Sequence, residues 1–306
     1  MSEQTLNRWQ ALSKKQAFLI HLALSILVFG TLVAIMMTLW FPGKLFFLDG
    51  GWQGLKIVAL IDIVLGPALT LLLYAPGKPK LLLDMSLIAL FQLSALAYGF
   101  YATYTQRTVA VVYADRNFIT LSADSAEIAK QELLERNKEI SSIADLDDRL
   151  PAMLVTPEPS PNEFGKYTSE LLSGYPELHE RLDLFEKRET KHADMLSARA
   201  VTMDRLSVTG ADAIVKKALD NINHDKDDIE FHHFKARYAK GVVLFSKREQ
   251  EILDYVAIPW NELISKKEAE LADSDSTENK SENSAPQAEN ENETTSRSEV
   301  AESVEQ

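Results

Sequence analysis

Ionizable side chains that could do chemistry lie inside long apolar stretches of this chain. Asp62 is placed about seven residues inside such a stretch, roughly 10 Å from its end in a helix. At matching depth, Ser94 and Tyr98 of a later stretch reach about the same level. A carboxyl group is costly in lipid, so it usually faces the interior of a helix bundle. Asp62 is therefore either a partner-binding acid or a protonated or hydrogen-bonded acid that only fixes packing.

Two glycine-containing motifs flank this acid. Gly66-Pro67 predicts a kink, because proline removes a helix hydrogen bond and neighbouring groups must satisfy the freed carbonyl. Such a kink would open a pocket beside Asp62 for another protein's helix, for a lipid head group, or for nothing. Asp49-Gly50-Gly51-Trp52 predicts a tight turn at the membrane surface, with Trp52 at head-group level. A partner contact and a simple re-entry turn both explain that motif.

Two further polar residues, His21 and Asp84, lie near the starts of their apolar stretches. They could form a structural pair between the first and third stretches. Snorkelling of each side chain to the interface explains them equally well.

The chain offers little to metals, cofactors or a catalytic mechanism. It has no cysteine, which removes disulfides, thiolate metal sites and cysteine nucleophiles. His224, His232 and His233 lie near three aspartates and suggest a metal site. The run 223–228 faintly resembles a calcium loop, but it lacks the glycine and the closing glutamate of such loops, and a solvated turn explains it better. None of the common catalytic motifs is present. We predict no catalytic residue, no metal and no cofactor.

Three stretches are long enough to span a bilayer, at about 17–41, 55–74 and 81–104. The first is far longer than the apolar core of a signal peptide and does not end in a small-residue cleavage site, so we interpret it as an anchor. The sequence thus predicts a flank at 1–16 and a three-helix membrane region at 17–106.

Basic residues predict the orientation of these spans. The N-terminal flank is basic, and the second loop holds Lys78 and Lys80 without an acid. The first loop holds only Lys44, balanced by Asp49. Because short cytoplasmic loops are enriched in lysine and arginine, the N-terminus is predicted to be cytoplasmic and residues 107–306 to lie outside.

The outer region is predicted to be a small α+β domain at 107–267. Two pairs of β-rich segments predict hairpins in one antiparallel sheet. Helical segments are expected between the two hairpins. The hairpin segments are 109–113 with 118–121 and 241–245 with 252–256, and the helices are 125–138, 176–199 and 212–222.

The last segment, 268–306, is polar and acidic, with twelve acidic and two basic residues. It has too few large apolar residues to offset the entropy of ordering, so we predict a disordered tail. This tail accounts for most of the net charge of −13. Nothing resembles the basic stripe of a nucleic-acid-binding protein.

An ordered set of short motifs across residues 17–121 resembles the type IV pilin accessory proteins of the TfpX/TfpZ family. The middle of the chain resembles that family only loosely, and the acidic tail lies outside its pattern. The motifs are Phe18-Leu19-Ile20-His21-Leu22, Trp40-Phe41-Pro42-Gly43, Leu48-Asp49-Gly50-Gly51-Trp52-Gln53-Gly54-Leu55, Asp62-Ile63-Val64-Leu65-Gly66-Pro67, Tyr74-Ala75-Pro76-Gly77-Lys78, Gln92-Leu93-Ser94-Ala95-Leu96-Ala97-Tyr98-Gly99 and Ala110-Val111-Val112-Tyr113-Ala114-Asp115-Arg116.

The resemblance implies a bacterial inner-membrane protein that helps a cognate major pilin reach the pilus, in a chaperone-like and non-enzymatic way. The implied partners are the major type IV pilin, the lipid bilayer and other pilus-assembly proteins. The expected partner-binding residues are Asp49, Gly50, Gly51, Trp52, Asp62, Gly66 and Pro67.

Two alternatives remain open at this point. The first is a sensor whose outer domain signals through the three spans, although only about sixteen residues precede the first span. The second is a membrane enzyme acting on a lipid-linked substrate, with Asp49 and Asp62 as its acids.

Overall fold

The structure is a computed structural model that describes residues 12–41, 43–189, 192–267 and 269. The chain divides into two compact units, Met1–Trp260 and Asn261–Gln306. All helices and strands named below belong to the first unit. The predicted disordered tail lies, apart from Ala269, outside the described residues.

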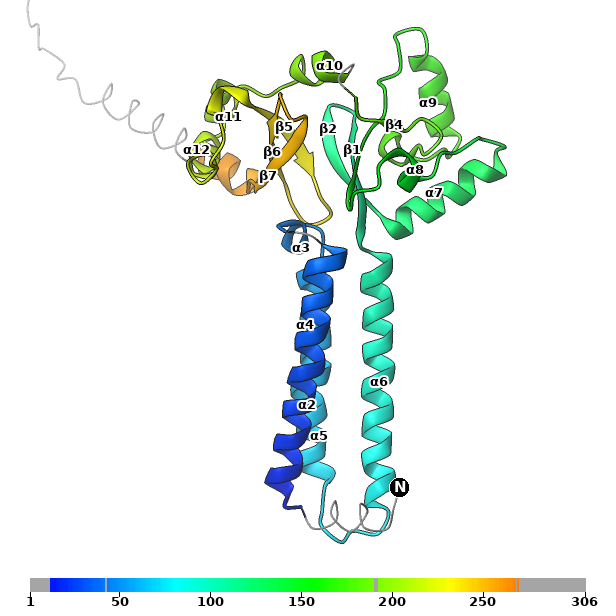
Figure 1. The fold of residues 1–306 in the computed structure, drawn as a ribbon, viewed down its shortest axis with the longest axis vertical. Coiled ribbons are helices and arrows are strands. Elements are labelled where there is room, and N and C mark those ends of the chain that lie inside the picture. The colour runs from blue at the N-terminus through cyan, green and yellow to red at the C-terminus, as the bar shows by residue number, and fades with distance from the viewer. Residues whose placement is uncertain (1–11, 42, 190–191, 268, 270–306) are drawn as a thin grey trace, which may run out of the picture. The chain divides into compact units, whose positions relative to one another are not determined.

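Three helices have the length and composition to cross a membrane, as predicted: Lys14–Trp40, Gly51–Leu73 and Leu81–Thr105. The first consists of α2 and a short π-helix, the second contains a π-helical turn, and the third is regular (Figure 1). Their segments are α2 (Lys14–Ile35), η1 (Met36–Trp40), α4 (Gly51–Ala59), η2 (Leu60–Leu65), α5 (Gly66–Leu73) and α6 (Leu81–Thr105).

A π-helical turn, η2, ends immediately before Gly66-Pro67, where the sequence predicted a kink. The backbone N–H of Gly66 donates to the carbonyl of Ile61, five residues back, instead of to Asp62. The donor five residues after Asp62 would be Pro67, which has no N–H. The Asp62 carbonyl is therefore left without a backbone donor in its own helix, and the side-chain amide of Gln92 in α6 donates to it at 3.4 Å.

Glycines let the second and third spans approach closely. A Cβ on Gly66 would lie 1.8 Å from Nε2 of Gln92, and one on Gly99 would lie 2.7 Å from Val58. Membrane helices use such small residues because packing, not hydrophobicity, holds them together in lipid. The glycine at position 66 is thus what allows Gln92 to reach the second span.

The outer domain contains a seven-stranded mixed sheet in the order β4-β3-β1-β2-β5-β6-β7. Both predicted hairpins are present, as β1–β2 and β6–β7. The strands are β1 (Thr108–Ala114), β2 (Asn117–Ser122), β3 (Ala152–Val155), β4 (Glu186–Lys187), β5 (Ile229–Lys235), β6 (Lys240–Ser246) and β7 (Glu251–Ala257).

The prediction of one purely antiparallel sheet was wrong. β1 pairs with β3 and β2 pairs with β5 in parallel register. Parallel neighbours need long connections, and here the helical middle of the domain supplies both of them. β5 was not predicted, and its two adjacent histidines were considered only as possible metal ligands.

The helices of the outer domain lie in the connections between its strands. Two predicted helices are confirmed as α7, capped by Ser122, and α12. The predicted helix 176–199 was wrong, because this segment contains a 3-10 turn, β4 and the short α10. The helices are α7 (Ala123–Glu135), α8 (Ile143–Leu146), α9 (Phe164–Leu172), η3 (Leu178–Glu180), α10 (Ala193–Ser197), α11 (Met203–Val208), α12 (Asp212–Asp220) and η5 (Lys226–Asp228).

Each face of the sheet has its own apolar core. On one face, Ala110 and Val112 of β1 pack with Leu133 of α7. On the other face, Val111 and Tyr113 pack with Phe245 of β6 in a second cluster. β1 is therefore buried on both sides, which places it at the centre of the domain.

The second core also contains residues from the loop between the first two spans. That loop forms the short helix α3 (Leu45–Leu48), and both Leu45 and Leu48 belong to the core cluster of the outer domain. The loop therefore packs into the outer domain and does not merely connect two membrane helices.

Candidate functional site

Asp49 joins the membrane region to the outer domain. Its Oδ1 accepts hydrogen bonds from the hydroxyl of Thr120 at 2.9 Å and from the backbone N–H of Arg237 at 3.0 Å. Its Oδ2 accepts a hydrogen bond from the hydroxyl of Thr108. The donors come from β1, β2 and the β5–β6 loop, and the carboxylate is buried. Asp49 therefore stabilises the attachment of the loop to three separate parts of the sheet.

The neighbouring residues of the motif shape the turn. Gly50 has φ of +105°, which favours glycine, and a Cβ there would lie 2.6 Å from the ring of Tyr238. Gly51 begins α4 against the ring and carbonyl of Phe46. Trp52 is 43% exposed, consistent with a side chain at head-group level. The turn is thus built around contacts within the chain, and Trp52 is its outward-facing member.

Asp62 lies in η2, and only one of its two carboxyl oxygens accepts a hydrogen bond from a described residue of the chain. Its Oδ1 accepts a hydrogen bond from Nε2 of Gln92 at 3.1 Å. Its Oδ2 is buried and, among the residues that the structure describes, has no hydrogen-bond partner. The hydroxyl of Ser25 in α2 is close enough to act on the carboxyl group as a weak donor, but it does not form a hydrogen bond with Oδ2. π-Helical turns of this kind are frequent at functional sites.

A groove of about 590 Å³ opens beside Asp62 between α2 and α6, with η2 and α5 behind it. Most of its wall is apolar. Polar side chains line it along its length, and these are His21, Ser25, Asp62, Thr70, Tyr74, Ser86 and Gln92. The groove combines apolar walls with a line of hydrogen-bonding groups inside a membrane-spanning bundle.

His21 and Asp84 have different partners in the structure. Nδ1 of His21 lies 2.6 Å from the hydroxyl of Thr70 in α5, while Asp84 forms an ion pair of 2.6 Å with Lys78. The suggested pair between them does not form, because Thr70 faces His21 from the second span and Lys78 lies in the loop before α6. His21 belongs to the groove and Asp84 to the end of the bundle.

Three known proteins are similar to this chain over 96 residues, each at 36% identity. All are fimbrial assembly proteins of Dichelobacter nodosus. The match covers 31% of this chain and 73% of the protein from serogroups C1 and C2. This chain belongs to the fimbrial assembly protein family.

The same match covers only 37% of the fimbrial assembly proteins of serogroups I and E1. This chain therefore matches just over a third of those two relatives. No family model and no solved structure matches it.

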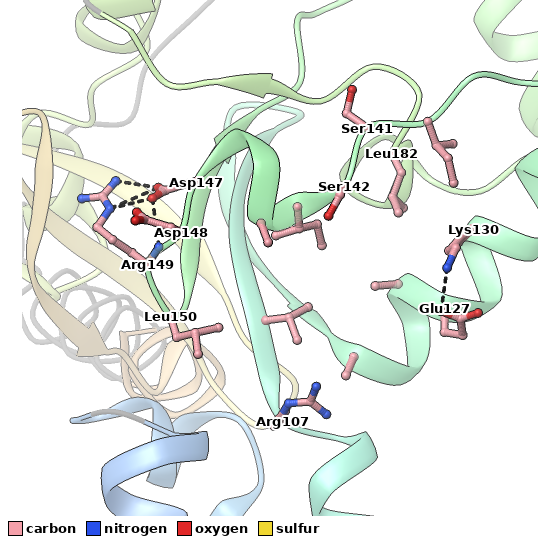
Figure 2. A pocket seen from close by; sticks show the side chains of 16 residues that line it. Arg107, Glu127, Lys130, Ser141, Ser142, Asp147, Asp148, Arg149, Leu150 and Leu182 are labelled. Atoms are coloured by element: carbon pink, nitrogen blue, oxygen red, sulfur yellow. Dashed lines mark hydrogen bonds and ion pairs between the residues drawn. The ribbon is translucent and has the colours of Figure 1, made fainter.

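A second cavity, about 570 Å³, lies in the outer domain beside α7 and α8 (Figure 2). Most of its charged side chains already have partners. Arg149 donates to Asp147 at 2.7 Å and to Glu251 at 2.8 Å, and hydrogen bonding from Arg149 lowers the pKa of Asp147 to about 2. Arg107 donates to the carbonyl of Tyr104. These pairs leave the cavity with no evident preference for a charged ligand.

Two of the histidines considered for metal binding pack or hydrogen-bond within the outer domain. His224 bonds Asp228 at 2.7 Å, and Asp228 also accepts from Ser246 at 2.6 Å. His232 is fully buried beside Phe118 and Phe245, and burial lowers its pKa to about 4. No group of metal-binding side chains was found among the described residues.

Sequence reasoning missed the residues that complete the Asp62 site of this family member. It placed Ser94 and Tyr98 at the level of Asp62, whereas Gln92 makes the contact and both of the others face outward. Two residues in a helix correspond to a rotation of about 200°, so a correct depth can still give the wrong face. The available signal was Gln92 itself, a lone amide in the middle of an apolar span.

Proposed function

We propose that this protein is a non-enzymatic accessory factor of type IV pilus biogenesis, which assists a cognate major pilin at the bacterial inner membrane. The observation that carries this proposal is the 36% identity to a fimbrial assembly protein over 73% of that protein's length. The motif resemblance to the TfpX/TfpZ family supplies the pilin as partner and the chaperone-like role.

The geometry supports a protein with two binding regions. A pilin is held in the inner membrane by one apolar helix, with its head outside. In our proposal the three-helix bundle binds that helix and the outer domain binds the head. Asp49 and α3 would keep the two regions in a fixed relation, because both connect the membrane region to the sheet.

This division of labour requires one orientation. The N-terminus would be cytoplasmic and residues 107–306 would be periplasmic, in accordance with the basic loop at Lys78 and Lys80. A cysteine introduced at exposed Lys216 should react with a membrane-impermeant maleimide in cells with a permeabilised outer membrane. A cysteine replacing Lys78 should react only after the inner membrane is opened.

Deletion of the gene tests the function directly. We expect surface pili to disappear while full-length pilin persists in the inner membrane, and plasmid-borne wild-type protein to restore the pili. Normal piliation in the deletion strain, with a cognate pilin expressed, would refute the proposal. Loss of pilin itself from the membrane would indicate that the protein protects pilin before assembly, which the proposal also includes.

A further inference from the structure

The groove between α2 and α6 has the features of a binding surface inside the membrane. Its walls include Leu24 of α2 and Leu93 of α6, which are both exposed. Its polar members come from all three spans, since Ser25 is in α2, Asp62 in η2 and Gln92 in α6. No two of the spans could form this surface without the third.

We propose that this groove receives one face of a single transmembrane helix from another protein, and that this helix brings a hydrogen-bond donor to Asp62. Resting on the proposed function, the helix is that of the pilin. The inference assigns the pilin-helix site to a particular face of the bundle, between the first and third spans.

The size of the groove fits one face of a helix. Its lining runs from Ala17 to Val28 on α2 and from Leu81 to Leu96 on α6, which corresponds to roughly 16–22 Å along the helices. This length corresponds to about three to four turns of a helix, so the groove is long enough to receive one face of a helix.

The position of Asp62 distinguishes a helix from a lipid. Asp62 is eleven residues from each end of the span Gly51–Leu73, so it lies at the middle of that span, roughly 16 Å from either end. A lipid head group remains at the membrane surface, and an acyl chain has no donor to offer. A helix with a polar side chain can place a donor at this depth.

Oδ2 of Asp62 is the atom that would accept a hydrogen bond from the incoming helix. Gln92 already occupies Oδ1 of Asp62, while Oδ2 has no partner among the described residues. A buried polar atom without a partner is costly, and most of all in lipid. Since Asp62 is 8% exposed, the donor must be carried on a side chain that enters the groove.

Site-specific photo-crosslinking in living cells tests the site. A photoreactive amino acid would replace Leu24 or Leu93 on the groove wall. Matched controls are Leu27 and Leu90, three residues away on the same helices and outside the groove. Their exposures are comparable, at 58% and 64% for the groove positions and 66% and 62% for the controls.

We expect pilin adducts from both groove positions and few from the controls. In Asp62→Asn, an NH2 group replaces one of the two carboxyl oxygens, so the side chain can no longer accept hydrogen bonds from both Gln92 and the incoming helix. This substitution should reduce the pilin adduct at Leu24 roughly threefold to thirtyfold. Adducts with lipid alone, with a second copy of this chain, or equally from control positions would overturn the inference. If deletion abolishes pili but the groove gives no pilin adduct, the groove inference fails and the proposed function stands.

Discussion

Asp49 and Asp62 are both buried acids, thirteen positions apart in the sequence, but their surroundings differ. Asp49 accepts hydrogen bonds from three donors of the outer domain, which occupy both of its oxygens. Asp62 receives one side-chain amide on one oxygen, and its other oxygen has no partner among the described residues. Both oxygens of the Asp49 side chain therefore have hydrogen-bond donors, whereas the Asp62 side chain has a donor among the described residues on only one.

This difference separates two roles that the sequence could not distinguish. A buried acceptor with all its donors in place holds elements together, and removing it leaves those donors unsatisfied. A buried acceptor with a missing donor is a place where a partner can contribute binding energy. In our proposal, Asp49 therefore belongs to the architecture and Asp62 to recognition.

The largest expected effect is at Asp49. Asp49→Ala would leave the hydroxyls of Thr108 and Thr120 and the backbone N–H of Arg237 without their acceptor. At about 1–3 kcal/mol for each unsatisfied buried group, we expect a loss of roughly 3 kcal/mol or more. Thermal unfolding of the full chain in detergent micelles measures this loss. A change below about 1 kcal/mol would contradict the structural role of Asp49.

The outer domain should also lose stability in mild acid through His232. Burial lowers its pKa to about 4, so the unfolded chain takes up a proton first as the pH falls. Between about pH 7.5 and 4.5 this would cost roughly 2–3 kcal/mol. His232→Leu should flatten the pH dependence measured by thermal unfolding, whereas His233→Asn, at an exposed position, should change it less. An unchanged profile in His232→Leu would exclude this cause.

A smaller effect is expected inside the membrane at Gly66. The methyl group of Gly66→Ala would displace the side-chain amide of Gln92 and remove both of its hydrogen bonds to Asp62. We expect a loss of about 1–2 kcal/mol in micelles. Gly30→Ala is the matched control, because no atom of the described residues lies within 4 Å of its added methyl group, apart from its own helix backbone and chain neighbours. Equal effects of the two substitutions would argue against a specific Gly66–Gln92 contact.

The smallest effect is expected at the ion pair between Lys44 and Asp254. The pair is short, at 2.6 Å, but the Lys44 side chain is exposed. Exposed pairs usually contribute no more than about 1 kcal/mol. Asp254→Ala should therefore change the unfolding temperature far less than Asp49→Ala. If the two were equal, the ion pair and not Asp49 would be the main link between loop and sheet.

The sequence predicted the features that depend on local pattern. Span lengths, both hairpins, α7 and α12 follow from apolar runs, β-rich segments and capping residues. The features that it missed depend on tertiary contacts. Leu178, Leu182 and Phe185 have helical spacing, yet they fill the core beneath β1 from an irregular segment.

The candidate site shows the same division. The depth of Asp62 and the irregularity at Gly66-Pro67 were predictable, because each follows from one residue type in one span. The contact with Gln92 depends on how α6 is rotated, which no pattern in a uniformly apolar helix determines. The burial of Leu45 and Leu48 in the outer domain likewise required the structure.

The most direct test of the central claim is a comparison of Asp62→Asn with the wild-type protein in cells, measuring surface pili and the amount of folded protein in the membrane together. We predict that Asp62→Asn leaves the amount of protein close to wild type while pili are lost or strongly reduced. Normal piliation, or a loss of pili that merely follows a loss of protein, would contradict the assignment of Asp62 to recognition.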